Sequence, residues 1–386
     1  MSRRVNSRAG RALLFVAMLL GGALALILVD ACTIINGLTV GQDGGAVGDA
    51  ADGGDSAVDP CVHTYPPAPR PPEPNSLPGS ELFVAVATDV SFGIDGGAFE
   101  AISFDLDGLC TCFPHEDTCK PNLGEKTKCD QLGGGQDNAA QELFRQAKNA
   151  SLDLQQDAKE SVEKGGRAIL IRVDGYNGLP NDPEVSVSVL VSPGHFVADV
   201  KTQPSYSTAD LWSVDMKAVY DKGGILIPFD TKTGYVVDGT LVVGPISISV
   251  PVADVALLTV SAAVLVGKIE PAPGGGFTLG EARFAGRWSN TEAAKVLGSF
   301  ERQTGTGAIC DGTDDQNVGL YKFFKQSVCQ ASDLRALPKD DRQGLACDAI
   351  SMAVTFKGKP ASLGTPREVI ASTACATATI DCSTAD

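Results

Sequence analysis

Asp105 and Asp107 are the two residues whose type and spacing best suit chemistry in this chain. Between Phe99 and Gly108, apolar and polar residues alternate, which is typical of a strand with one buried face. In such a strand both carboxylates lie on the exposed face, about 6.5–7 Å apart. Paired carboxylates could bind calcium or flank a sugar bond, as in glycosidases. The simpler alternative is an acidic strand end that leads into an Asp-Gly turn.

A second acidic segment occurs late in the chain. Asp311 and Asp315 lie in the stretch between Cys310 and Asn317. This stretch could also attract calcium, but neither acidic segment has the ligand and glycine spacing of a calcium-binding loop. A solvated acidic turn before a helix is the ordinary explanation here. The sequence suggests one cofactor, calcium, with Asp105, Asp107, Asp311 and Asp315 as its candidate ligands. It indicates no other cofactor.

Motifs for nucleophilic or metal-dependent catalysis are missing from the sequence. The chain has no G-x-S-x-G or H-E-x-x-H segment, and its three histidines are His63, His115 and His195. The pattern therefore favours a binding or structural domain over an enzyme. The alternative function is an extracellular polysaccharide hydrolase that uses Asp105 and Asp107.

Aromatic residues are sparse but include side chains that could stack on sugar rings. These are Trp212, Trp288, Tyr206, Tyr220 and Tyr235. Packing in the core is the competing interpretation for each of them. A binding protein should leave some of them exposed on a concave face.

Without Cys32, the 11 cysteines leave ten, an even number that is consistent with five disulfides in an oxidising compartment. Four of these ten cysteines lie close together in the sequence, on either side of His115. The other six lie either before this loop, at residue 61, or after residue 309. The predicted disulfide cysteines are Cys61, Cys110, Cys112, Cys119, Cys129, Cys310, Cys329, Cys347, Cys375 and Cys382.

Their pairing is predicted from proximity in the sequence. Cys110 and Cys112 should point to the same side of a strand, so each is expected to pair with Cys119 or Cys129. A zinc site in this loop is a less favoured interpretation than disulfides, since the cysteine spacing lacks the paired C-x₂-C motifs of zinc-binding domains. Cys61 is expected to join the group of Cys310, Cys329 and Cys347, and Cys375 to pair with Cys382.

The elements that must position these residues are mostly strands. Alternating Val and Ser residues at 184–191 and 246–250 predict half-buried strands, and the apolar run 255–266 predicts a strand covered on both faces. Helices are expected at about 138–164, 289–302 and 316–330. We therefore predict a mainly β domain over residues 81–386. Its expected fold is a disulfide-bonded β-sandwich, jelly-roll or lectin-like, with a few inserted helices and a possible boundary near residue 290.

The N-terminus carries an export signal. Four arginines precede an uncharged apolar run from Ala12 to Val29, and Asp30, Ala31 and Cys32 follow. This order resembles the lipobox of bacterial lipoproteins, although Asp30 departs from its pattern. The resemblance implies a signal peptide at residues 1–31, acyl chains such as palmitate on Cys32, and, with Thr33 next, attachment to the outer membrane or cell surface. An uncleaved signal anchor or ordinary cleavage near Ala31 remains an alternative.

Residues 32–80 are predicted to be a lipid-anchored, disordered tether rich in Gly, Asp and Pro. The net charge of −16 would repel a polyanion, which excludes nucleic acid as a partner. The sequence thus predicts an exported cell-envelope lipoprotein with a binding or structural domain. Its expected partners are the membrane, through the N-terminal lipid, and a glycan or an envelope protein.

Overall fold

A computed structural model describes residues 61–70, 79–94, 101–112, 118–122, 128–130, 135–149, 153–252, 256–299, 308–311, 315–370, 375 and 379–382. The predicted signal peptide, Cys32 and the tether up to residue 60 lie outside these residues. Residues 58–386 form one compact unit. The described residues 61–70, which the sequence assigns to the tether, belong to this unit.

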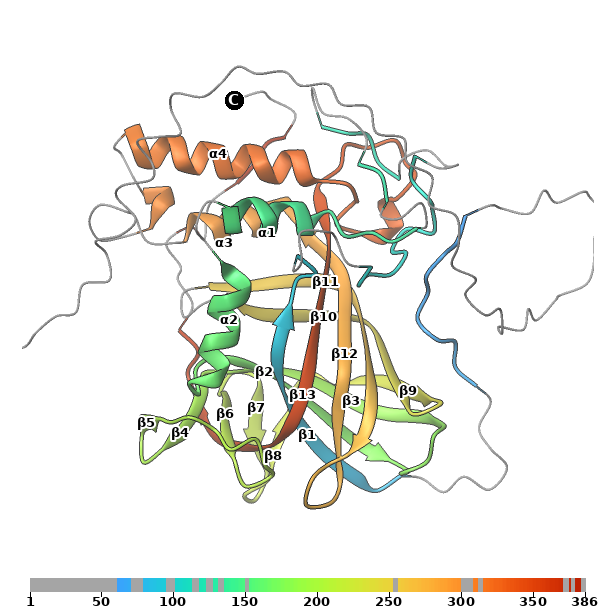
Figure 1. Ribbon diagram of the computed structural model, residues 1–386, viewed down its shortest axis with the longest axis vertical. Coiled ribbons are helices and arrows are strands. Elements are labelled where there is room, and N and C mark those ends of the chain that lie inside the picture. Colours follow the sequence, from blue (N-terminus) through green and yellow to red (C-terminus); the bar gives the residue numbers. More distant parts are fainter. Residues whose placement is uncertain are drawn as a thin grey trace, which may run out of the picture. The chain divides into compact units, whose positions relative to one another are not determined.

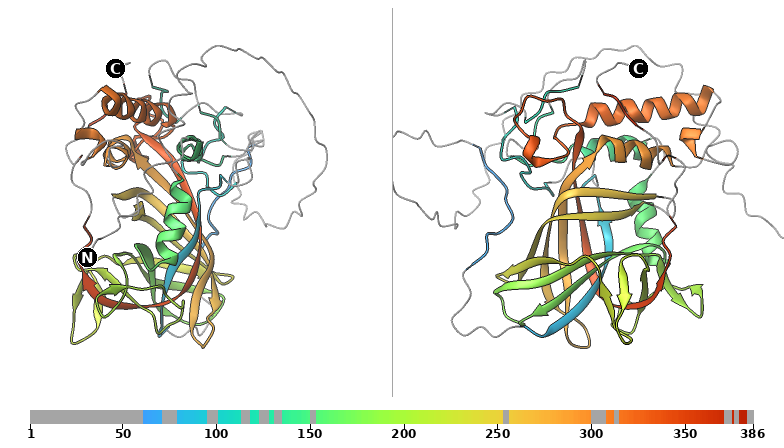
Figure 2. Two further views of the ribbon diagram at one scale, coloured as in Figure 1. Left: turned by 60° about the vertical axis from the view of Figure 1, so that its left-hand side comes forward. Right: turned by 180° about the vertical axis from the view of Figure 1, so that it is seen from behind.

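Eight antiparallel strands close into a barrel (Figures 1 and 2). They are, in sheet order, β1 (Glu81–Ser91), β2 (Ala168–Tyr176), β3 (Asp182–Ser192), β9 (Lys232–Val237), β10 (Thr240–Val252), β11 (Ala256–Pro271), β12 (Phe277–Ser289) and β13 (Ala349–Arg367). Pairing of β1 with β13, for example Val84 opposite Ala361, joins the two ends of the sheet.

The predicted sandwich is therefore wrong, while the mainly β class and the disulfides are confirmed. One buried face and one wet face give the same alternation of residues in a sandwich and in a barrel. Closure depends instead on pairing between β1 and β13, which lie at opposite ends of the domain sequence.

The barrel interior is an apolar core. It contains Ile171, Leu241, Ile248, Leu265, Phe284 and Met352, all fully or almost fully buried. Gly286 lets neighbouring strands approach closely, since a Cβ there would lie 2.8 Å from atoms of Ala263 and Val260. An apolar cavity of about 30 Å³ remains where α2 (Leu154–Glu163) meets the barrel. The interior is packed with side chains rather than open.

Short strands extend the sheet from β13 along the outside of the barrel. These are β6 (Leu211–Asp215), β4 (Gly194–Val197) and β5 (Val200–Lys201), and β6 runs parallel to β13. A separate hairpin pairs β7 (Val219–Asp221) with β8 (Leu226–Pro228). Val84, Val86 and Leu170, on the outer face of β1 and β2, pack with Trp212 into a second apolar cluster.

Helices α1 (Ala140–Asn149), α3 (Asn290–Gly298) and α4 (Asp315–Ala331) gather at one end of the barrel (Figure 1). The helix predicted over 138–164 is two helices, because Asp153 caps α2 by accepting a hydrogen bond from the amide of Gln156. The predicted start of α3 is confirmed, with Ser289 as its cap. Short 3₁₀ turns occur at Ile309–Asp311 and Pro338–Asp340.

These helices and the loops around them form what we call the cap, defined as the described residues within 101–149, 290–348 and 375–382. Five disulfides tie it together: Cys61–Cys110, Cys112–Cys129, Cys119–Cys347, Cys310–Cys375 and Cys329–Cys382. Only the pairing of Cys112 with Cys129 agrees with prediction. The predicted partners of Cys61, Cys110 and Cys375 are wrong, because disulfide partners are decided by the fold rather than by distance in the sequence.

Arg287 joins the cap to the barrel. Its guanidinium projects from β12, is buried, and donates to both carboxylate oxygens of Asp341, each at 2.7 Å. It also donates to the backbone oxygens of Arg335 and Leu106 at 2.8 Å. A buried guanidinium with this many acceptors fixes the cap loops against the wall.

Among the described residues, no helix is both long and apolar enough to cross a membrane.

Candidate cation site

Three chain segments meet outside the barrel wall and build the site. Residues 101–107 do not form the predicted strand over their described part. Instead Ile102 and Phe104 pack on outward-facing residues of the barrel, and the guanidinium of Arg283 lies 4.0 Å from the Phe104 ring. The amide of Asp105 donates to Thr64 O at 2.9 Å, and that of Asp137 donates to Phe104 O at 3.0 Å. These bonds hold residues 61–70 and 135–138 against the segment.

The carboxylates of Asp105, Asp107 and Asp137 converge at this junction. One oxygen from each lies within 4.8 Å of the other two. Gly135 allows the close approach, since a Cβ there would lie 2.9 Å from Asp105 Oδ2 and 2.5 Å from Leu109 O. The sequence predicted Asp105 and Asp107 as ligands on an exposed face, but the Asp105 side chain is 0% exposed. The prediction of an exposed face is therefore wrong for Asp105, because residues 61–70 and 135–138 pack against its segment, while Asp107 is half-buried.

Hydrogen bonds account for most, but not all, of these oxygens. Asp105 accepts from the amide of Gly108 at 2.6 Å and is hydrogen-bonded to His63 Nδ1. Asp107 Oδ1 accepts from the amide of Leu109 at 2.8 Å, and Asp137 Oδ2 from that of Leu106 at 2.6 Å. Asp107 Oδ2 is buried without a hydrogen-bond partner in the described part of the chain. A buried carboxylate oxygen without a partner requires a physical explanation, such as a bound ion.

Burial shifts the titration of this cluster. Loss of hydration, with smaller contributions from the charges of Asp130, Asp105 and Asp333, raises the pKa of Asp107 to about 7, although the hydrogen bond from Leu109 lowers it. Burial, followed by the charge of Asp107, raises the pKa of Asp137 well above its ordinary range. Burial also raises the pKa of Asp333 to about 7, although Ser351 donates to it. Carboxylates this close cannot all ionise without a compensating cation.

The cluster borders a cavity of about 340 Å³ beneath α1 and α4. Carboxylates line it, namely Asp130, Asp137, Glu142 and Asp333, with Gln136 and Gln330 among the remaining lining residues. The amide oxygen of Gln136 is also buried without a partner in the described structure. Asp137 of the cluster therefore lies at the wall of this cavity.

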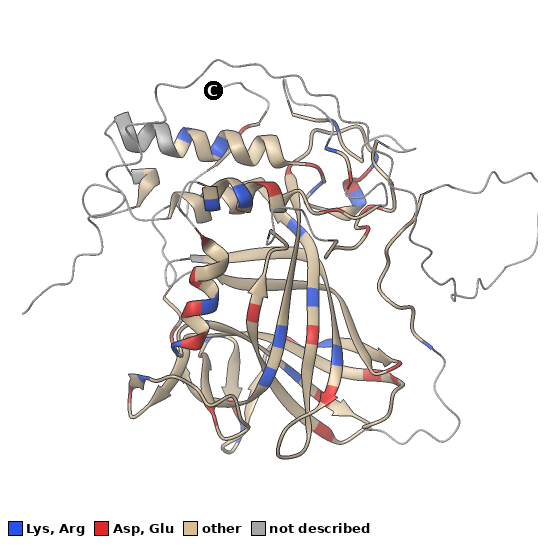
Figure 3. Ribbon diagram, in the orientation of Figure 1, with Lys and Arg blue, Asp and Glu red and all other residues tan. Residues whose placement is uncertain are grey.

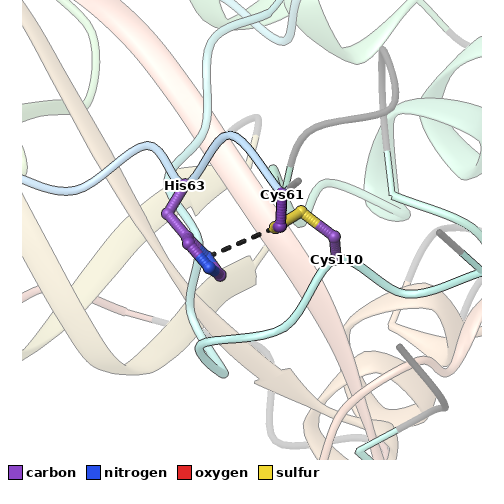
Figure 4. A group of neighbouring side chains, drawn as sticks. All are labelled: Cys61, His63 and Cys110. Atoms are coloured by element: carbon purple, nitrogen blue, oxygen red, sulfur yellow. Dashed lines mark hydrogen bonds between the residues drawn. A yellow bond between two sulfur atoms is a disulfide. The ribbon is translucent and has the colours of Figure 1, made fainter. Parts of the chain in front are cut away.

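All the converging ligand atoms are oxygens, which suits calcium better than zinc. Cys61, His63 and Cys110 form a second group of possible ligands (Figure 4), and the hydrogen bond between His63 and Asp105 joins it to the aspartates. Cys61 and Cys110 form a disulfide, so their sulfurs carry no thiolate charge and cannot serve as zinc ligands. His63 Nδ1 lies 3.5 Å from Cys61 Sγ and faces Asp105, so this ring supports the aspartate cluster.

The other two predicted ligands, Asp311 and Asp315, stay predictions. Asp311 ends a 3₁₀ turn and Asp315 begins α4, and their side chains lie outside the described ones. Sequence reasoning missed Asp137, Asp130, Asp333 and His63. No local pattern marks these residues as partners of Asp105, since each lies on a different segment.

His195 is not part of a nucleophilic relay. It is buried, its Nδ1 lies 2.7 Å from Thr202 O, and its Nε2 lies 3.6 Å from Asp210 Oδ1. The hydroxyl of Ser205 donates to Asp210 rather than to the imidazole. The arrangement holds the loop before β6 in place.

Two of the five proposed sugar-stacking residues are core residues. Trp212 and Trp288 are fully buried, and Tyr206 and Tyr235 are half-buried. Tyr220 is exposed. An open groove on the outer wall is lined by Lys268, Arg283, Lys357 and Lys359 and by Glu270 and Glu281. Figure 3 shows both charge signs along the barrel strands. This mixture gives the groove no clear ligand preference.

Comparisons of the chain with protein families, curated proteins and solved structures give no match. The chemistry of the site therefore rests on the residues described above.

Proposed function

We propose that this protein is an exported envelope lipoprotein whose barrel domain binds calcium at Asp105, Asp107 and Asp137. The observation that carries the calcium site is the buried, unpartnered Oδ2 of Asp107 within a cluster of converging carboxylate oxygens. A divalent cation there would satisfy this oxygen and offset the repulsion among the carboxylates. Calcium suits irregular loops better than magnesium, which requires near-octahedral geometry.

The role of the cation would be to hold the cap together at the junction of three segments. Asp105 and Asp107 come from one segment and Asp137 from another, and His63 links the third to Asp105. A cation that binds the folded state only stabilises it by mass action, about 2.7 kcal/mol at a hundredfold excess over its dissociation constant. The barrel domain would then act as a calcium-stabilised binding or structural module in the envelope.

The test is calorimetric titration of calcium into the oxidised, chelator-treated full chain, followed by thermal unfolding. We expect one calcium per chain and a raised melting temperature, and both effects should be lost in Asp107→Asn and Asp137→Asn. Asp230→Asn is the matched control, since Asp230 is an exposed aspartate of the β8–β9 loop. Absence of calcium binding by the folded wild-type chain would sink the proposal.

The anchor part of the proposal rests on the lipobox resemblance around Cys32. Lipidation of this residue would attach the domain to the outer membrane or cell surface, where glycans and envelope proteins are the available partners. Cys32→Ala should abolish incorporation of labelled palmitate and release the protein from membranes or leave it unprocessed. Unchanged mass and unchanged membrane attachment in this variant would exclude lipidation.

The alternative, a polysaccharide hydrolase that uses Asp105 and Asp107, stays a prediction. Full burial of the Asp105 side chain and its bond to His63 Nδ1 favour a ligand role over contact with a polymer. Turnover of a polysaccharide by the wild-type chain that Asp105→Asn abolishes would reverse this preference.

A further inference from the structure

The Cys61–Cys110 disulfide contacts all three chain segments that build the cation site. Cys61 lies on the first segment, residues 61–70, and Cys110 lies on the same segment as Asp107. The amide of Gly135, on the third segment, donates to Cys110 Sγ at 3.0 Å. Both cysteines are buried. This crosslink therefore joins the site at the point where its segments meet.

His63 links the disulfide to one of the proposed ligands (Figure 4). Its Nδ1 lies 3.5 Å from Cys61 Sγ and is hydrogen-bonded to Asp105, whose side chain is fully buried. The backbone oxygen of Thr64 accepts from the amide of Asp105 at 2.9 Å, and its hydroxyl accepts from Nε2 of Gln136 at 3.1 Å. Residues 63 and 64 therefore contact both segments that carry the aspartates, and the disulfide fixes them covalently to the cap.

A crosslink at this junction holds the carboxylates in place before an ion arrives. Carboxylates that repel one another converge only where the chain holds them, and ordering their segments costs conformational entropy. A site that is already ordered binds its ligand more tightly, because binding no longer has to offset that cost. Opening the disulfide removes the covalent hold on residues 61–64, so calcium must then order them at a cost in affinity.

We propose that the Cys61–Cys110 disulfide positions the calcium ligands, and that bound calcium in turn protects this disulfide from reduction. This redox control rests on the proposed function, since it acts on the same calcium site. The reductant is a dithiol: the bond between Cys61 and Cys110 breaks, each sulfur gains one electron and one proton, and the two sulfurs of the dithiol join in a disulfide.

Coupling between calcium binding and reduction is reciprocal. If reduction weakens calcium binding about tenfold, saturating calcium lowers the equilibrium constant for reduction by the same factor. That factor corresponds to a reduction potential about 30 mV more negative. The redox state of one crosslink thereby sets the calcium affinity of the cap.

The Cys310–Cys375 disulfide is a matched control within the cap. Its cysteines are 65 residues apart, compared with 49 for Cys61 and Cys110, so removal of either crosslink should cost a similar amount of stability. It lies against α3, where a Cβ on Gly298 would be 2.8 Å from Cys375 Sγ. Its loss should therefore leave the three aspartates in place.

Calorimetric titration of calcium chloride into the full chain, with and without this disulfide, tests the proposal. Cys61→Ala combined with Cys110→Ala should weaken calcium binding at least about tenfold. Cys310→Ala combined with Cys375→Ala should leave the affinity within about twofold of wild type. Unchanged affinity in the first double variant would overturn the redox control and leave the proposed function intact. Absence of calcium binding by the wild-type chain would overturn both.

Equilibration of the wild-type chain with reduced and oxidised dithiothreitol gives a second measurement that requires no variant to fold. Alkylation of free thiols followed by mass spectrometry measures the reduced fraction of each cysteine pair. Saturating calcium should lower the equilibrium constant for reduction at least about tenfold for Cys61–Cys110 and less than about twofold for Cys310–Cys375. An equal shift at both pairs would show general stabilisation instead of positioning, and it would overturn the proposal, as would no shift at either pair.

Discussion

The barrel and the cap are held together by different forces. The barrel is a closed ladder of backbone hydrogen bonds around an apolar interior, and none of the ten disulfide-bonded cysteines lies in its strands. The cap contains short helices and irregular loops, and all five disulfides and the buried aspartates contribute to it. A barrel can rely on burial, whereas loops that bury little apolar surface need crosslinks and ions.

The largest expected effect comes from the barrel core. Phe284→Ala removes a ring that is almost fully buried and packs near Phe356, so it should lower the free energy of unfolding by about 4 kcal/mol. Denaturant titration followed by circular dichroism measures this loss. If the barrel dominates stability, hydrogen exchange should speed up in the barrel and the cap together. Faster exchange confined to the cap would show that the barrel core does not dominate the stability of the whole domain.

A smaller effect is expected from the longest crosslink in the cap. Cys119 and Cys347 are separated by 228 residues, and their joint replacement by Ala should cost about 3 kcal/mol. Hydrogen exchange should rise at residues 118–122 and in the 338–348 loop, while β10 and β11 keep their protection. Equal loss of protection in those strands would show that the cap and barrel unfold as one unit.

The pH dependence of stability should differ between the two regions. The pKa of Asp107 and that of Asp333 are each raised from 3.8 to about 7 in the folded cap. Below about pH 4 these groups are protonated in both states, and their stabilising effect is lost as the pH rises through about 7. With chelator present, the free energy of unfolding should therefore fall between about pH 4 and pH 7.

Calcium should reduce this decline, because the cation replaces the proton on Asp107. Denaturant titrations across this pH range, with chelator and with calcium, measure the difference. Asp107→Asn is the informative variant, since it should make the chelator curve less steep, with the contribution of Asp333 remaining, and remove the calcium effect. A wild-type chain whose stability rises steadily across the range would refute the protonated state of the cluster.

The smallest effect is expected where residues 61–70 leave the cap and lie along the barrel. Arg70 and Asp238 form an exposed ion pair at 2.6 Å, so Arg70→Ala should cost about 0.5 kcal/mol or less. Cys61, at the cap end of the same segment, is fixed by its disulfide to Cys110. Proteolysis near residue 70, with residue 61 protected, would confirm that this segment is anchored mainly at the cap.

The sequence by itself determined the class of fold and several element ends. Alternating Val and Ser residues mark β3, and Ser289 marks the start of α3, because both signals depend on neighbouring residues only. The number and position of the cysteines likewise indicated an oxidised protein, since that inference requires no knowledge of their partners.

Only the tertiary structure decided the closure of the barrel, the disulfide partners and the cation site. Each depends on contacts between residues far apart in the chain, such as β1 with β13 and Cys119 with Cys347. Asp105 and Asp107 could be singled out from their spacing. Asp137 could not, because it reaches them only where the loop before α1 folds back onto residues 104–106.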